Sequence, residues 1–119
     1  DKSIQIKPDF WQAINNKGLA YFEKNNINFS IKLFEKAISI QDNAEPILGL
    51  ASCLRIKDIE LALQLAKKAL SKDPNYVSND YREEQLWGEK LQISTEILLQ
   101  NESLQTDVIL AKSKIKASY

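Results

Sequence analysis

The sequence contains no histidine, a single cysteine, and only three glycines and three prolines. The absence of histidine removes the side chain most often used as a general base and as a metal ligand. The single cysteine, Cys53, excludes an intrachain disulfide framework and a zinc site built from several cysteines. The scarcity of glycine and proline argues against a disordered chain and against an all-β fold rich in turns. The 119 residues therefore suit one globular domain.

Long apolar runs and an excess of one charge are also missing. No apolar run approaches the about 18 residues that a membrane-spanning helix needs, so no membrane span is expected. Sixteen basic residues balance sixteen acidic residues, which leaves no overall field to attract nucleic acid or an anionic membrane. The compartment stays open, because the start DKSIQIKP, without an initiator methionine, is expected of a trimmed chain or of one that has lost a signal peptide.

No pattern in the sequence indicates catalysis or a bound cofactor. Cys53 has no histidine to activate it and lies on an apolar helical face, so a packed structural thiol is expected. Glu83 and Glu84 are adjacent on a predicted helix and do not face each other, which fits a solvated capping role better than a catalytic pair. Gly49 and Gly88 are isolated, so no phosphate-binding loop is present. We therefore predict a protein that is not an enzyme and has no cofactor or metal.

Apolar residues recur at helical spacing in four segments of the first 75 residues, which predicts four helices. The polar stretch 24–28 (KNNIN) separates the first two helices, and Lys57–Asp58 separates the last two. Pro46 fits the first turn of the third helix, where its missing N–H costs nothing. Asp73–Asn75, with a proline at its centre, ends the fourth helix. No segment shows sustained alternation of apolar and polar residues, so no strand is expected.

The last third of the chain carries two more helical patterns. Asp80 and Glu83 have the D-x-x-E spacing of a capping box, so a helix is expected to begin there and to run as far as Leu99. A single apolar stripe then predicts the last helix, and the lysines near its end favour a helix C-terminus. We therefore predict an all-α fold of six helices in three hairpins. The stripe of the last helix consists of Leu104, Val108, Ala111 and Ile115.

The second hairpin repeats the first. Four residues near the end of the second helix recur 32 residues later, near the end of the fourth. Self-similarity at this distance is typical of helical repeat arrays, in which each hairpin leaves one apolar face for the next hairpin to cover. The recurring pairs are Lys36 and Lys68, Ala37 and Ala69, Ser39 and Ser71, and Asn43 and Asn75.

Residues 13–75 resemble the tetratricopeptide repeat, W-x2-L-G-x2-Y…A-x3-F…A…P. The resemblance implies a right-handed stack of hairpins, with residues 10–43 and 44–75 as repeats and 76–119 as a degenerate third hairpin or cap. Lys17, where leucine is usual, is the clearest departure. The stretch YREEQLWGEKLQISTEILL is also similar to the ends of some tetratricopeptide proteins of cyanobacteria. The matching residues are Gly18, Tyr21, Phe34 and Ala37, then Ile47, Leu50, Ala51, Leu54, Ala62, Ala69 and Pro74.

Members of that family hold a peptide or helix of a partner in a concave groove lined by the first helix of each hairpin. The resemblance therefore implies a protein–protein interaction module, a scaffold or adaptor. Phe22 and Arg55 each lie one residue past the tyrosine step of the pattern, which predicts Phe22 as an apolar anchor and Arg55 as a hydrogen-bond donor, although Phe22 could instead pack against the start of the second helix. The family's clamp for chaperone tails is not expected, because Leu19 and Gly49 stand at positions where it needs polar side chains. The predicted partner-binding residues are Gln12, Asn15, Leu19, Phe22, Glu23, Ser52, Arg55, Arg82 and Gln85, with Leu48, Ile56 and Glu89 on the same exposed side.

Two other functions stay open beside this one. The chain could be a structural spacer or a self-associating repeat protein with no dedicated ligand, so a homo-oligomer remains an alternative. Related helical hairpins read RNA bases, but neutral net charge and the absence of a basic stripe predict no nucleic-acid partner. Trp11 and Trp87 could stack on a base or a sugar, although their helical spacing favours a place in the core.

Overall fold

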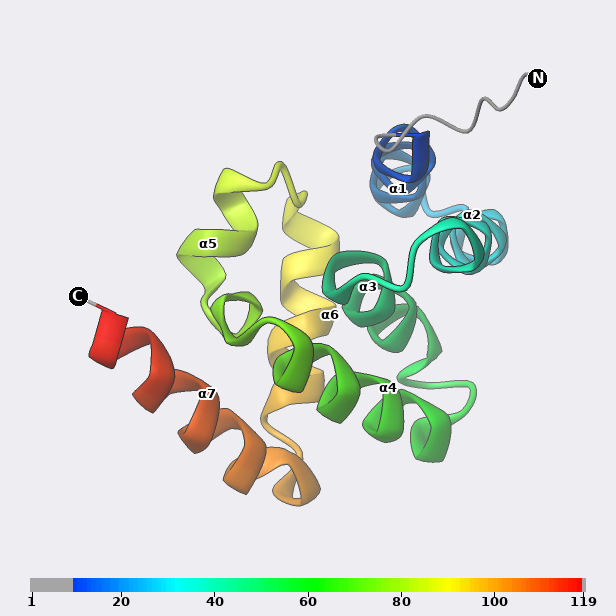
Figure 1. Ribbon diagram of the computed structural model, residues 1–119. Helices are drawn as coiled ribbons and strands as arrows, with labels where there is room; N and C mark the ends of the chain where they lie inside the picture. Colours follow the sequence, from blue (N-terminus) through cyan, green and yellow to red (C-terminus); the bar gives the residue numbers. More distant parts are fainter. Residues whose placement is uncertain (1–9, 119) are drawn as a thin grey trace.

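The computed structural model describes residues 10–118, and within that range the chain forms seven α-helices and two short 3-10 helices with no strand (Figure 1). The predicted all-α fold is confirmed, but the predicted number of six helices is wrong. Residues 1–9 of the predicted single domain lie outside the described residues. The elements are α1 (Phe10–Glu23), α2 (Ile27–Ile40), α3 (Ala44–Leu54), α4 (Ile59–Lys72), η1 (Pro74–Val77), α5 (Asn79–Glu84), α6 (Glu89–Leu99), η2 (Glu102–Leu104) and α7 (Gln105–Ser118).

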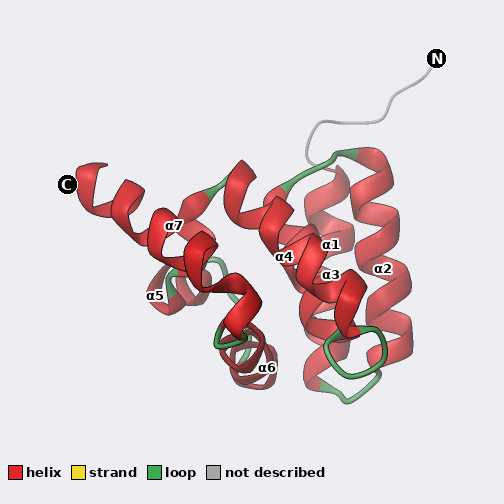
Figure 2. Cartoon of the chain, turned by 90° about the horizontal axis from the view of Figure 1, so that it is seen from below, coloured by secondary structure: helices red, strands yellow, loops and turns green. Residues whose placement is uncertain are grey.

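The first four helices form two hairpins, α1 with α2 and α3 with α4, and α2 also packs against α3 (Figure 2). The fully buried ring of Phe34 fills the space between α1 and α3. A Cβ at Gly18 or at Gly49 would lie 2.9 Å from that ring, closer than carbon atoms pack. The Ser30 hydroxyl donates a hydrogen bond to the Gly18 carbonyl over 2.8 Å. Two glycines therefore let Phe34 join the hairpins.

The predicted helix ends in the first 75 residues are confirmed. Asn25 ends α1 in the left-handed conformation with φ 66°, which asparagine tolerates better than most residues. The Asp58 carboxylate accepts the Leu61 N–H over 3.2 Å and so caps α4. Pro46 lies in the first turn of α3, and Pro74 follows the end of α4. These local signals explain why the four helices follow the sequence pattern.

The helix predicted from Asp80 to Leu99 is instead two helices, α5 and α6. Helix α5 ends because the Trp87 N–H bonds the Arg82 carbonyl over 3.1 Å and the Leu86 N–H bonds the Glu83 carbonyl over 3.0 Å, the hydrogen-bond pattern of a Schellman motif. Leu86 occupies the left-handed position of that motif, with φ 72°. The predicted capping box is also wrong, because α5 is capped by the Ser78 hydroxyl, which accepts the Tyr81 N–H.

Leu86 pays a conformational cost at this position, because a side chain with a Cβ disfavours the left-handed conformation by roughly 1–2 kcal/mol. Its side chain is 77 % exposed, so little packing offsets that cost. We expect Leu86→Gly to raise the free energy of unfolding by about 0.5–1 kcal/mol, since glycine adopts this conformation freely but loses more entropy on folding. Urea denaturation measures the change. Asn25→Gly is the control, and we expect a smaller gain in the free energy of unfolding there, because asparagine already tolerates the left-handed conformation. A Leu86→Gly variant less stable than the wild type would show that the leucine side chain packs against the fold.

The third unit lies beside the two hairpins and consists of α5, α6 and α7 (Figure 1). Helix α6 packs on α3 and α1, whereas α7 packs on α4 and η1. Leu91, Thr95 and Leu98 point from α6 into the core and are buried. Trp11 and Trp87 are buried as well, in agreement with the predicted core role. None of the described helices combines the length and apolarity that a membrane span requires.

Candidate functional site

Helix α6 covers the surface on α1 and α3 that the sequence predicted as an open groove. The Glu23 carboxylate at the end of α1 accepts the Lys90 N–H over 2.9 Å and the Leu91 N–H over 3.0 Å, so it caps the first turn of α6. Gly88 precedes this turn, and a Cβ there would lie 2.3 Å from the Glu23 carboxyl carbon. Glycine at 88 therefore lets the end of α1 approach the start of α6.

Two hydroxyl contacts fix α6 on α3 further along its length. The Ser52 and Thr95 hydroxyls lie 2.7 Å apart and share a buried hydrogen bond. The Ser94 hydroxyl donates to the Ser52 carbonyl over 3.0 Å and accepts from Arg55 Nε over 3.2 Å. Because these groups are satisfied within the fold, Ser52 is a packing residue of the α3–α6 contact.

The predicted exposure of the groove residues is therefore wrong for most of them. Helix α6 and the packing between the hairpins cover them, and only Gln12 is fully exposed among the nine predicted partner-binding residues. Glu23, Arg55 and Gln85 are partly exposed. Their part in partner binding stays a prediction, but a buried side chain cannot contact a partner in this conformation. The buried residues are Asn15, Leu19, Phe22, Leu48, Ser52 and Arg82, while Ile56 and Glu89 are exposed as expected.

Arg82 is a buried structural side chain. Its Nε donates to Gln92 Oε1 over 2.7 Å, its Nη1 donates to the Tyr76 carbonyl over 2.7 Å, and its Nη2 pairs with the Glu96 carboxylate. Burial lowers the pKa of the guanidinium, and the Glu96 carboxylate opposes that effect. The planar guanidinium thus ties α5 to η1 and α6 with three nitrogens, a geometry that lysine cannot supply.

Glu45 forms a second buried polar cluster, which the sequence analysis missed. Trp87 Nε1 donates to Glu45 Oε2 over 3.0 Å, and the Tyr76 hydroxyl donates to Glu45 Oε1 over 3.2 Å. Burial raises the pKa of the Glu45 carboxyl above its ordinary value of 4.5, although these donors and the Asn15 amide act in the opposite direction. Asn15 is fully buried, and its amide makes no hydrogen bond of good geometry. An acidic residue beside Pro46 in a first helical turn gave no sign of this role.

The raised pKa of Glu45 gives a testable dependence of stability on pH. The folded state prefers the protonated carboxyl, so the contribution of Glu45 to stability is fully present below pH 4.5 and is lost as the pH rises through the raised pKa. We expect Glu45→Gln to gain stability relative to the wild type as the pH rises from about 4 to about 8, since the neutral amide needs no deprotonation. Urea unfolding at several pH values measures this. Glu84→Gln, at an exposed site, is the control, and parallel pH curves for Glu45→Gln and wild type would contradict the assignment.

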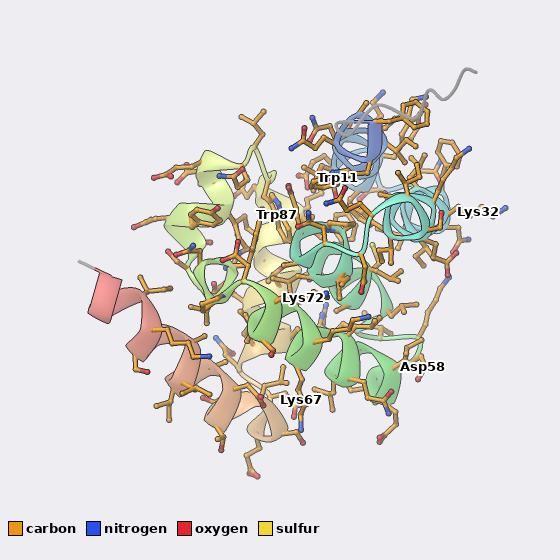
Figure 3. All side chains as sticks on the ribbon, in the orientation of Figure 1. Trp11, Lys32, Asp58, Lys67, Lys72 and Trp87 are labelled. Carbon is orange, nitrogen blue, oxygen red and sulfur yellow. The ribbon has the colours of Figure 1, made fainter. Side chains whose placement is uncertain are left out.

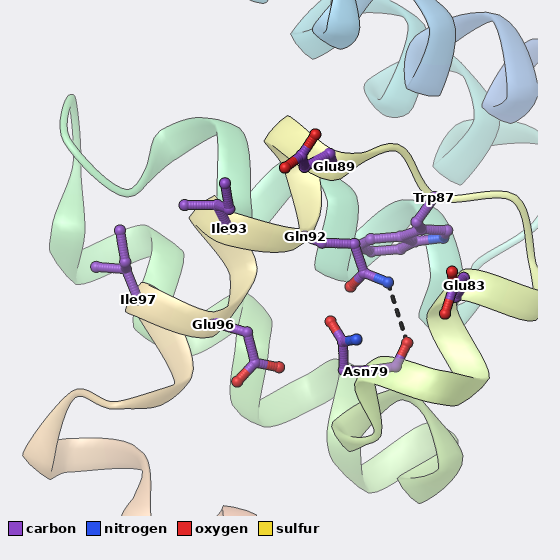
Figure 4. A pocket seen from close by; sticks show the side chains of 8 residues that line it. All are labelled: Asn79, Glu83, Trp87, Glu89, Gln92, Ile93, Glu96 and Ile97. Carbon is purple, nitrogen blue, oxygen red and sulfur yellow. Dashed lines mark hydrogen bonds between the residues drawn. The ribbon is translucent and has the colours of Figure 1, made fainter.

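Three hollows meet on the outer side of α6. The basic hollow, of about 410 Å³, lies between α6 and the ends of α1 and α3. The acidic hollow, of about 560 Å³, lies between α6 and α5 (Figure 4). A third hollow of about 290 Å³ lies near the end of α6. Arg55 lines the basic and the third hollow, Ile93 lines the basic and the acidic hollow, and Ile97 lines the acidic and the third hollow.

Four isoleucines are exposed around these hollows. Ile93 and Ile97 follow each other by one turn on α6 and are 54 % and 46 % exposed. Ile56 and Ile59, near the start of α4, are 81 % and 38 % exposed and lie across from them, since Ile56 lines the basic hollow and Ile59 the third hollow. Together with Arg55 they form what we call the α6 face. Grouped exposed apolar side chains with a polar rim are typical of protein interaction sites.

The charges on the two sides of the α6 face differ in sign. Among the described residues, the basic side chains of the basic hollow form no ion pair. Arg55 bonds the Ser94 hydroxyl, and Lys90 Nζ donates to Asn25 Oδ1 over 3.1 Å. Lys57 likewise bonds an amide oxygen, that of Asn28. Among the described residues, the cations of this hollow therefore bond hydroxyl and amide oxygens and form no ion pair with a carboxylate.

The acidic hollow has the opposite character. Its carboxylates are Glu83, Glu89 and Glu96, with Trp87 and Gln92 between them (Figure 4). Glu96 pairs with Arg82, but Glu83 and Glu89 are exposed and form no ion pair with any side chain that the structure describes. Gln92 Nε2 donates to the Asn79 carbonyl over 3.0 Å and so joins the two walls. The hollow thus offers two free carboxylates beside the apolar Ile93 and Ile97.

No family model, no curated protein and no solved structure matches this chain. Function is therefore inferred from the residues themselves. The described residues hold no group of three or more metal-ligating side chains. Burial raises the pKa of the Cys53 thiol to about 12, so this thiol stays protonated at neutral pH and is a poor nucleophile. Exposed apolar side chains, hollows and unpaired charges coincide at the α6 face.

Proposed function

We propose that this chain is a protein–protein interaction module that docks a segment of another polypeptide on the α6 face. The observation that carries the proposal is the group of four exposed isoleucines around Arg55, where three hollows meet. Arginine is enriched among the residues that dominate the binding energy of protein interfaces, and grouped exposed apolar side chains mark interaction sites. Arg55 is held by Ser94 in a partly buried position, which reduces the entropy that binding would cost.

We also propose that the fold is a right-handed, tetratricopeptide-like stack with a divergent third unit. The support is the packing of Phe34 between Gly18 and Gly49, together with the repeat of similar residues in the two hairpins. In this interpretation α6 takes the place of the third groove helix and lies across the groove, closing it. The binding surface then moves from the inner side of α1 and α3 to the outer side of α6, while Phe22 and Arg55 still line one hollow.

The proposal is tested by selecting ligands from a displayed random-peptide library against the purified chain. We expect Arg55→Glu and Ile93→Ser each to weaken binding of a selected peptide by at least about 2 kcal/mol, because both replace contacts of the α6 face. Calorimetric titration measures the change, and circular dichroism checks the fold. Phe22→Ala is a poorer test than the sequence suggests, since Phe22 is buried and its loss would also destabilise the chain.

The matched control is Lys67→Glu on the exposed side of α4 (Figure 3). Lys67 lines none of the three hollows, and it forms none of the ion pairs found among the described residues, whereas Lys68 pairs with Asp42 over 3.3 Å. We expect this variant to bind as the wild type does, with an effect below about 0.5 kcal/mol. Peptides that lose affinity for Lys67→Glu but not for the α6-face variants would place the binding surface on α4.

A further inference from the structure

We propose that the partner of the α6 face is a second copy of this chain, in a symmetric dimer. This inference rests on the proposed function, because it names the occupant of the same surface. In the dimer the basic hollow of each copy lies against the acidic hollow of the other. Ile93 and Ile97 of the two copies pack on each other between the hollows.

The two hollows lie on opposite flanks of one helical ridge. At 100° per residue, Ile93 and Ile97 point outward in nearly the same direction. Glu89 and Glu96 fall on one side of that direction, whereas Lys90 and Ser94 fall on the other side. The hollows follow the same division, since Glu89 and Glu96 line the acidic hollow and Lys90 and Ser94 line the basic hollow. The ridge residue Ile93 lines both hollows.

This arrangement is complementary to itself under one kind of two-fold symmetry. A half-turn about an axis that lies in the interface and runs parallel to α6 exchanges the two flanks of the ridge. Each acidic flank then faces the basic flank of the other copy, and each ridge isoleucine lies near its own counterpart, as an isologous interface requires. A two-fold axis perpendicular to α6 would instead place like charges opposite each other, which is unfavourable. The charge pattern therefore selects the parallel arrangement of the two α6 helices.

The charges that would meet are not held in ion pairs within the described part of the chain. Lys57 and Lys90 on the basic flank and Glu83 and Glu89 on the acidic flank are exposed and form no ion pair among the described residues. The net charge of the whole chain is zero, so two copies do not repel each other at long range. The apolar part is modest, and we expect a dimer with a dissociation constant of about 1–100 µM at low salt.

Sedimentation equilibrium of the wild-type chain is the first test. We expect the weight-average mass to rise from one chain to two across about 1–300 µM, and the association to weaken by about tenfold or more in high salt. A chain that stays monomeric over this range overturns the proposal. So does an association that is lost in Lys67→Glu, because that residue lies outside the α6 face.

Charge reversal on one flank at a time gives the sharper test. The basic-flank variant carries Lys57→Glu with Lys90→Glu, and the acidic-flank variant carries Glu83→Lys with Glu89→Lys. Each variant alone would place like charges opposite each other at both contacts, so we expect it to dimerise at least about tenfold more weakly than the wild type. An equimolar mixture of the two variants restores opposite charges at both contacts, and we expect it to form a mixed dimer about as well as the wild type.

The outcomes separate this inference from the proposed function. Monomeric variants that fail to pair when mixed, while circular dichroism shows both folded, overturn the symmetric dimer. The proposed function then stands or falls separately, on whether selected peptides bind the wild type and lose affinity for Arg55→Glu and Ile93→Ser. A wild-type chain that binds such peptides yet never dimerises refutes the second copy alone. If the wild type dimerises and the mixture of the two variants dimerises as well, the symmetric dimer and the proposed function are both supported.

Discussion

Replacing Trp87 with alanine should lower the free energy of unfolding by about 3–5 kcal/mol, the cost of removing a large buried aromatic side chain. Trp87 lies in the loop between α5 and α6 (Figure 3). Its ring is buried against that of Tyr76, with centroids 6.2 Å apart. Its indole N–H also satisfies the buried Glu45 carboxylate. A loss of this size is a large fraction of the roughly 6–18 kcal/mol expected for a domain of this length.

Urea denaturation followed by far-ultraviolet circular dichroism measures the effect of Trp87→Ala. Trp87→Phe is the matched variant, since it keeps most of the ring but removes the N–H donor to Glu45. We expect it to cost less than the alanine variant, by about 1–3 kcal/mol in total, because a buried acceptor loses one partner. A loss below about 1 kcal/mol for Trp87→Ala would show that the side chain is not part of the core, and a role in stacking on a ligand would then be favoured.

Replacing Arg82 with alanine should cost about 3–5 kcal/mol, because it removes one partner of a buried network and leaves a cavity. The guanidinium is fully buried and donates to Gln92, Glu96 and the Tyr76 carbonyl. Without it, Gln92 Oε1 and the Tyr76 carbonyl lose a strong donor in a site that water reaches poorly. The contact between α5 and α6 would weaken as a result.

Two conservative variants show whether the Arg82 network acts through geometry or through charge. Arg82→Lys keeps the charge but cannot reach three acceptors in different directions, so we expect a loss of more than about 1 kcal/mol. Glu96→Gln should cost less than Arg82→Ala, since the Glu96 side chain is 46 % exposed and the other two acceptors remain. Thermal melts of the purified variants measure both. An Arg82→Lys variant as stable as the wild type would mean that charge alone matters at this position.

The four helices of the two hairpins could be predicted from the sequence because local signals and periodicity agree there. Asp58 and Pro74 mark helix ends by their own chemistry, without help from distant residues. The close approach at Gly18 also follows from the pattern, since a small residue faces a large one, Phe34, on the neighbouring helix. Gly49 was missed in this role, because the repeat pattern assigns the small position to Ala51 instead.

The third unit could not be predicted in the same way. Leu86 and Trp87 continue the apolar stripe across the α5–α6 break, and nothing local indicates that Leu86 adopts a conformation usual for glycine. The sequence of α3 did indicate that its groove side is buried, but the match to the repeat pattern obscured this. The residues of α3 from Ala44 to Cys53 are buried on all sides, and its sequence AEPILGLASCL is apolar around most of the helix. Such a helix is expected to be covered on every face, and α6 supplies the missing cover.

The most direct test of the α6 face as the binding surface is hydrogen–deuterium exchange. It is measured on the chain alone and on the chain saturated with a polypeptide that binds it. Either a peptide selected from the library or a second copy at high concentration serves as that polypeptide. The amides of α6 and of the α3–α4 turn should exchange more slowly in the complex, because docking there opposes local opening of these segments. The amides of α2 and of the second half of α4 should be unchanged. Protection confined to α2 and the second half of α4, with α6 exchanging as in the free chain, would contradict the proposed binding surface.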